Sequence, residues 1–310
     1  WDSKTHNATI LATTPLQTPW KLFNTTIWIN QLMPHFSLLD NWQQDRRQFE
    51  QALATKQATS ADTAISQLPL IEIPTHLSST TPTSNTLAII ISGDGGWANI
   101  DKDIANAIRY AVDNGAKVIN ASFGKKFSPN AEWVNEALKY AASKDVLFVH
   151  AAGNDGLDLD DLQNSNFPND HLGKNAPELV DTYLTVGALS PVYGSEMIAS
   201  FSNYGKSNVD VFAPGDKIYS TMPGNDYDFQ GGTSMAAPAV AGIAGLIRSY
   251  FPQLTAAEVK KIIMDSGLSL PIAVAVGEEE KTLDQISKSG KIANLYNALI
   301  LASDTIRKKN

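Results

Sequence analysis

From residue 101 onward, apolar residues follow two patterns, a helical spacing and short unbroken runs. In segment 101–115, Ile104, Ile108 and Val112 share one side of a helix that Gly115 ends. Several runs rich in Val, Ile, Leu and Phe are typical of buried strands. Helices are expected over 101–115, 130–144, about 234–250 and 255–267, and strands over 116–124, 145–154, 183–188 and 209–215.

The order of these segments predicts the fold class. Strands that alternate with helices favour an α/β fold, with a mainly parallel sheet and helices on both faces. Thr255 and Glu258 have the spacing of a capping box, which marks the start of the helix expected at 255–267.

Residues 1 to about 68 have a more polar character and contain four of the six tryptophans. A helix is expected over 38–58 and strands over 68–74 and 87–92. This change in character predicts two parts, an N-terminal segment over 1–100 and a domain over 101–310.

Composition narrows the classes of function. The chain has 310 residues, 43% of them hydrophobic, and a net charge of −8, which argues against nucleic acid as its partner. It contains no cysteine, so neither disulfides nor a thiolate metal site are expected. No apolar run reaches the length that spans a membrane. These quantities leave the oligomeric state open.

The segment 228–250, DFQGGTSMAAPAVAGIAGLIRSY, places Ser234 between a glycine turn and a run of small apolar residues. A helix start offers unpaired backbone N–H groups, which suits a serine nucleophile whose own N–H faces a developing oxyanion. Small neighbours leave room for a substrate backbone. An N-cap is the more frequent use of such a serine, so this local chemistry alone favours the structural role.

Four blocks in order resemble the subtilisin-like serine proteases (subtilases): VINASFG (118–124), HAAGNDG (150–156), FSNYG with VDVFAPG (201–215), and GGTSMAAPAVAG around Ser234. The resemblance covers about residues 101–300 and implies a serine endopeptidase that acts on peptides or proteins without a cofactor. It also implies site residues. These are Ser234 as nucleophile, Asn154 as oxyanion donor, and Ser122, Phe123, Gly124 and Gly153 along the substrate cleft.

The partners that such a serine needs are missing from the expected place. Subtilases carry an Asp after an early strand and a His in an H-G-T-H block, and this chain has no such block. We therefore expect an incomplete sheet on the N-terminal side, weak turnover, and no histidine in hydrogen-bonding reach of Ser234. A catalytically inactive peptide-binding scaffold is the alternative. The histidines are His6, His35, His76, His150 and His171.

A second resemblance concerns residues 16–103. The run SGDGGW (92–97), followed by an acidic helix start, is similar to the bacterial virulence proteins VirJ and AcvB. This implies a periplasmic, α/β-hydrolase-like segment, so the localisation is expected to be secreted or periplasmic. The elbow motif of that fold is poorly matched, because Asn120 replaces the first glycine before Ser122.

Two acidic segments are weak candidates for metal binding. Asp158, Asp160 and Asp161 are candidate calcium ligands, yet they lack the spacing of an EF-hand, and a solvated loop is favoured. The run GEEEK (277–281) is likewise expected to be a solvated loop.

Overall fold

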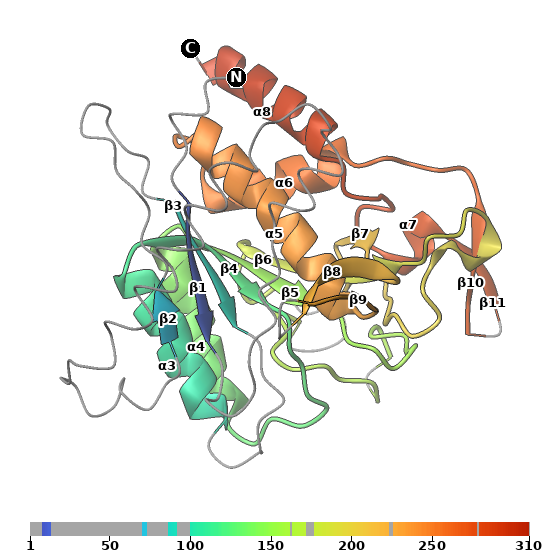
Figure 1. Cartoon of the computed structure of the whole chain (residues 1–310), viewed down its shortest axis with the longest axis horizontal. Coiled ribbons are helices and arrows are strands. Elements are labelled where there is room, and N and C mark those ends of the chain that lie inside the picture. Colours follow the sequence, from blue (N-terminus) through green and yellow to red (C-terminus); the bar gives the residue numbers. More distant parts are fainter. Residues whose placement is uncertain are drawn as a thin grey trace.

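A computed structural model gives the chain an α/β fold built on one seven-stranded sheet (Figure 1). The strand order is β2-β1-β3-β4-β5-β6-β7, and each neighbouring pair is parallel except β1 and β2. The expected fold class is confirmed. The residues that the structure describes are 8–13, 70–72, 86–91, 100–161, 163–171, 177–222, 226–277 and 279–309.

Six of the seven strands fall where the apolar runs predict them, and only β1 has no counterpart in the predictions. The helix expected over 38–58 lies outside the described residues. The strands are β1 (Ala8–Thr13), β2 (Leu70–Glu72), β3 (Thr86–Ile91), β4 (Ala116–Ala121), β5 (Leu147–Ala151), β6 (Tyr183–Leu189) and β7 (Val211–Pro214).

Helices cover both faces of the sheet (Figure 1). Side chains alternate between the faces, so Val118 packs beneath one helical layer while Ile119 packs beneath the other. Both faces are apolar, which explains why the strands read as unbroken runs. One layer contains α5 (Thr233–Tyr250), α6 (Ala256–Ser266) and α8 (Leu295–Lys309), and the other contains α3 (Ile100–Asp113) and α4 (Ala131–Ser143).

The start of α6 confirms the predicted capping box. The Thr255 hydroxyl accepts from the Glu258 backbone N–H at 3.2 Å, and the Glu258 carboxylate accepts from the Thr255 N–H at 2.9 Å. Two spare N–H groups at the helix end are satisfied in this way.

The prediction of a solvated loop over 277–281 is wrong in part. Gly277, with a φ of 61°, instead lies in the connection of a hairpin between β10 (Ala273–Val276) and β11 (Glu279–Thr282). Val274 and Val276 are buried while the β11 side chains are mostly exposed, so this hairpin lies on the domain with one face only. The remaining elements are η2 (Ser195–Met197), β8 (Ile218–Met222), β9 (Asp226–Gln230) and α7 (Leu283–Ile286).

Within the described residues, no helix is long and apolar enough to cross a bilayer.

Candidate functional site

The candidate site lies where β4 and β5 end and α5 begins. The two strands are parallel neighbours, so the segments that follow them leave the sheet at the same edge. One of these segments starts with Ser122 and the other contains Gly153 and Asn154. The buried side of α5 packs on this sheet, which brings the first turn of α5 to the same place.

Ser234 lies in the first turn of α5, after Gly231 and Gly232. Gly232 has a φ of 152°, in a region that favours glycine, and a Cβ at this position would lie 3.3 Å from Asn154 Nδ2. Among the described residues, no acceptor takes the backbone N–H of Ser234. A spare donor at a helix N-terminus is suited to an anionic oxygen.

Thr233 orients the side chain of Asn154. The Asn154 carbonyl oxygen accepts from the Thr233 backbone N–H at 2.8 Å and from the Thr233 hydroxyl at 2.9 Å. The same hydroxyl accepts from the Gly153 backbone N–H at 3.0 Å. Because both bonds hold the Asn154 oxygen, its Nδ2 is left as a donor on the side of Ser234, and no described acceptor takes it.

Ser122 is bonded directly to Ser234. The Ser122 hydroxyl donates to the Ser234 carbonyl at 2.9 Å, and the Ser234 hydroxyl donates to the Ser122 carbonyl at 3.2 Å. Asn120 Nδ2 donates to the Ser122 hydroxyl at 2.9 Å, which fixes its orientation. The segment after β4 and the start of α5 are therefore tied together at the candidate nucleophile.

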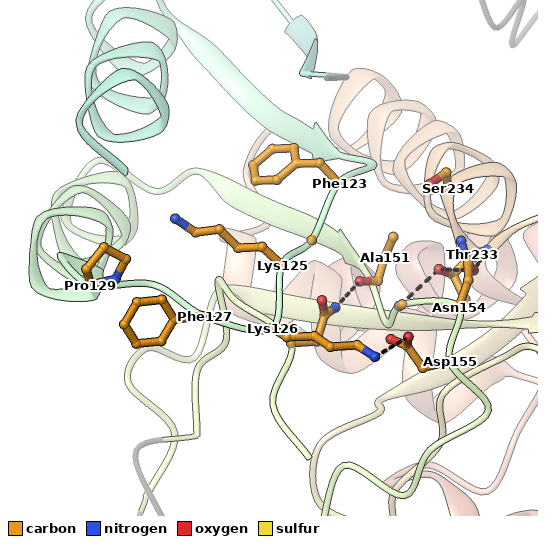
Figure 2. Close-up of a pocket in the computed structure, with 13 residues that line it drawn as sticks. Phe123, Lys125, Lys126, Phe127, Pro129, Ala151, Asn154, Asp155, Thr233 and Ser234 are labelled. Atoms are coloured by element: carbon orange, nitrogen blue, oxygen red, sulfur yellow. Dashed lines mark hydrogen bonds and ion pairs between the residues drawn. The ribbon is translucent and has the colours of Figure 1, made fainter. Parts of the chain in front are cut away.

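A pocket of about 760 Å³ extends from Ser234 along the segments after β4 and β5 (Figure 2). Predicted site residues Ser234, Asn154, Phe123, Gly124 and Gly153 all line it. Ser122 is not among the lining residues, but it is hydrogen-bonded to Ser234, which is. The other residues that line the pocket are Lys125, Lys126, Phe127, Pro129, Ala151, Asp155, Asn166 and Thr233.

The far wall of the pocket is anchored by a buried ion pair between Lys125 and Asp101, in the first turn of α3. The Asp101 carboxylate also accepts from the Ser128 hydroxyl at 2.6 Å and the Asn130 backbone N–H at 3.2 Å. Burial works to raise the pKa of Asp101, but these hydrogen bonds outweigh it and hold the pKa below its ordinary value. Lys125 extends away from Ser234 in Figure 2.

His150 is a packing residue rather than a base for Ser234. Its Nε2 lies 2.7 Å from the Phe123 carbonyl, which can only accept, so this nitrogen carries the proton. The ring is 1% exposed and packs among Phe123, Phe148 and Tyr183. Burial lowers the pKa of His150 to about 4, against the smaller opposite effect of the bond to Phe123.

In the part of the chain that is described, neither His150 nor His171 bonds to the Ser234 hydroxyl, whose partner is the Ser122 carbonyl. The other three histidines, His6, His35 and His76, lie outside the described residues.

The acidic segment expected to be a loop uses its carboxylates within the protein. Both oxygens of Asp160 accept from the Ser207 N–H, and one of them also accepts from Asn208. Asp158 and Asp161 accept backbone N–H groups two residues on, at 3.0 Å each. Among the described residues, no group of three or more His, Cys, Asp or Glu side chains gathers as a metal site would require.

Two contributors to the site were not singled out from the sequence. Thr233 lies within the GTSM block, directly before Ser234, and the resemblance implied no role for it. Asn166 comes to the pocket from a distant loop with no motif of its own, so no local signal could have found it.

Comparisons with known proteins identify the family of the chain. A model of the subtilase family of S8 peptidases matches residues 78–290. Thermitase of Thermoactinomyces vulgaris is 38% identical over 178 residues, which cover 56% of this chain and 55% of thermitase. The halolysin-like extracellular serine protease Nep of Natrialba magadii is 34% identical over 182 residues, covering 58% of this chain and 30% of Nep.

The solved structure of the patellamide maturation protease PatA superimposes with a TM-score of 0.54 at 25% identity, over 71% of this chain and 75% of that one. The aligned part of the chain spans about half the length of thermitase and less than a third of Nep.

Proposed function

Because the chain belongs to the subtilase family, we propose that residues 101–310 form a serine endopeptidase domain that acts on peptide or protein substrates. Ser234 is the proposed nucleophile and Asn154 the proposed oxyanion donor. One observation carries the proposal: the Ser234 hydroxyl, its unpaired N–H and the Asn154 amide meet at the mouth of one pocket. Ser122, Phe123, Gly124 and Gly153 are the proposed cleft residues, and the last three of them line the pocket.

The proposed chemistry is an acyl transfer. Ser234 Oγ attacks the scissile carbonyl carbon, and the carbonyl oxygen becomes an oxyanion that accepts from the Ser234 N–H and from Asn154 Nδ2. The serine proton passes to solvent water as the bond forms, and the departing amine takes a proton from water. The leaving half then diffuses away, and water releases the acyl half from Ser234.

Turnover is proposed to be slow, because no described histidine receives the serine proton. A serine hydroxyl without a base is a weak nucleophile at neutral pH. Removing the base of a subtilisin-type triad costs on the order of a million-fold in turnover, a value measured on subtilisin itself.

A fluorophosphonate probe tests the nucleophile, since the rate at which it labels a serine increases with the activation of that serine. The full chain is incubated with the probe and analysed by intact mass and peptide mapping, with Ser234→Ala as the control. Slow labelling that is confined to Ser234 supports the proposal, whereas labelling elsewhere contradicts it. Casein hydrolysis at ordinary protease rates, lost in Ser234→Ala, would show that residues outside the described ones supply a base.

A second candidate function is an inactive scaffold that binds peptides. The observation in its favour is the Ser234 hydroxyl, which is engaged with the Ser122 carbonyl rather than with a base. No labelling of Ser234, together with measurable binding of peptides, would establish this alternative.

For the N-terminal segment 1–100 we propose a relationship to VirJ and AcvB. The motif of this chain that carries it, at residues 92–97, lies outside the described residues. The family match begins at residue 78, so the boundary near residue 100 is itself a proposal. A location outside the cytoplasm is proposed because the relative Nep is described as extracellular. Secretion of the tagged full-length gene product would test it.

A further inference from the structure

The side chain of Asn166 fills the space between the two walls of the pocket. It is 9% exposed and lines the pocket beside Gly124 on one wall and Gly153 on the other. A Cβ at Gly124 would lie 2.2 Å from Asn166 Oδ1, and one at Gly153 would lie 3.1 Å from Asn166 Nδ2. Both glycines therefore leave the room that this amide occupies, and any larger residue at Gly124 would displace it.

The orientation of the Asn166 amide is fixed by two hydrogen bonds that its amino group donates. Nδ2 donates to the Ala151 carbonyl at 3.1 Å and to the Ala152 carbonyl at 2.9 Å, at the end of β5. Carbonyls accept only, so the amino group must face them and both of its protons are used. The remaining atom, Oδ1, takes no hydrogen bond from the described residues. Asn166 thus offers the pocket an acceptor and no donor.

The charges that line the pocket are already paired. Lys126 Nζ lies 2.7 Å from the Asp155 carboxylate, across the two walls (Figure 2). Lys125 is paired with Asp101, away from Ser234. A charged side chain that enters the pocket would find no free counter-ion among the described lining residues, and its loss of hydration would go uncompensated.

From these contacts we infer that Asn166 is a specificity-determining residue, which selects an uncharged side chain that donates a hydrogen bond, with glutamine as the best fit. The inference rests on the proposed function, since it assumes that a peptide lies with its scissile carbonyl at Ser234. The side chain beside that carbonyl then enters the pocket that starts at Ser234 and Asn154 and passes Asn166. A carboxylate at the same place faces the Asn166 oxygen and is rejected.

Equilibrium binding tests the inference without turnover. The full chain carrying Ser234→Ala is titrated into dye-labelled peptides Ala-Ala-Ala-X-Gly-Gly, and fluorescence anisotropy is followed. X is glutamine, the methyl ester of glutamate, glutamate or lysine. The ester is neutral and close in shape to glutamine but has no N–H. We expect glutamine to bind about tenfold more tightly than the ester, as one ordinary hydrogen bond allows, and glutamate and lysine to bind more weakly still.

Two variants locate the effect. In Asn166→Ala the preference of glutamine over the ester should disappear, with circular dichroism as the check on folding. Lys126 is 69% exposed, so Lys126→Met should fold normally and release the Asp155 carboxylate. Binding of the lysine peptide should then rise about three- to fivefold, the range of an exposed ion pair, while the glutamine peptide is unaffected.

The outcomes separate the inference from the proposed function. Preferential binding of the glutamine peptide supports the inference even if Ser234 of the wild-type chain is never labelled. Equal binding of glutamine and the ester overturns it even if the wild-type chain hydrolyses peptides, and so does an absence of binding. If Asn166→Ala does not fold, the glutamine–ester comparison and Lys126→Met still decide.

Discussion

Ser122 and Ser234 exchange two hydrogen bonds, each hydroxyl donating to the other residue's carbonyl, at 2.9 and 3.2 Å. The bond to the Ser234 carbonyl has a specific origin. In a regular helix this carbonyl would accept from the residue four positions on, but that residue is Pro238, which has no N–H. The Ser122 hydroxyl takes the place of the missing donor. Because Pro238 leaves the Ser234 carbonyl free, the first turn of α5 is hydrogen-bonded to the segment after β4.

The Ser122–Pro238 relationship predicts a coupling between two substitutions. Ser122→Ala should lower the free energy of unfolding by about 1–2 kcal/mol, because it leaves a carbonyl unpaired. In a Pro238→Ala background the same substitution should cost less, because the new N–H donates to Ser234. A double-mutant cycle in urea measures the difference. Equal costs in both backgrounds would contradict the explanation.

Thr233 should matter through its hydroxyl. Thr233→Val keeps the shape but removes the bonds to Gly153 and Asn154, in a position that is 0% exposed. We expect a loss of about 1–3 kcal/mol in unfolding free energy and slower labelling of Ser234, because the Asn154 amide is then held by the Thr233 backbone N–H alone. Thr233→Ser, which keeps the hydroxyl, is the matched control and should remain close to wild type.

His150 predicts a loss of stability in acid. Its pKa is about 4 when folded and near the ordinary 6.5 when unfolded, so between these values the unfolded chain binds the extra proton. Stability should fall by about 1.4 kcal/mol per pH unit as the pH drops through this window. His150→Gln, which preserves a donor for Phe123, should remove that share of the slope in denaturation curves at pH 4.5 to 7. An unchanged slope would mean that His150 is charged when folded.

The buried carboxyl Asp170 predicts the opposite trend. Burial, and then the nearby charge of Asp210, raise its pKa to about 8, with Lys260 working against them. The folded chain therefore holds a proton that the unfolded chain has lost, and stability should fall as the pH rises from about 4 to 8. Asp170→Asn should reduce this dependence of the free energy of unfolding on pH, measured in denaturation curves between pH 4 and 8. Asp210→Asn can be measured in the same way, because burial also raises the pKa of Asp210, whose carboxylate lies 3.4 Å from Lys260 Nζ.

Much of the fold was predictable because its signals are local. The apolar runs at β4 to β7 match strands that are covered on both faces, as the packing of Val118 and Ile119 on opposite sides illustrates. Thr255 and Glu258 are close in sequence, so their capping box could be recognised without a fold. The β10–β11 hairpin was missed because its acidic second strand has no apolar alternation, and its buried apolar side chains, Val274 and Val276, both come from β10.

The sequence by itself determined where Ser234 stands. Two glycines, a threonine and a run of small residues require a tight turn into a helix, and those preferences act within a few residues of the chain. Only the tertiary structure decided what surrounds that serine. Asn166 lies between Gly124 and Gly153, and the Ser122 hydroxyl replaces a donor that Pro238 lacks. These contacts join separate segments of the chain, which meet because both faces of one sheet are buried. No local pattern in the sequence could therefore predict them.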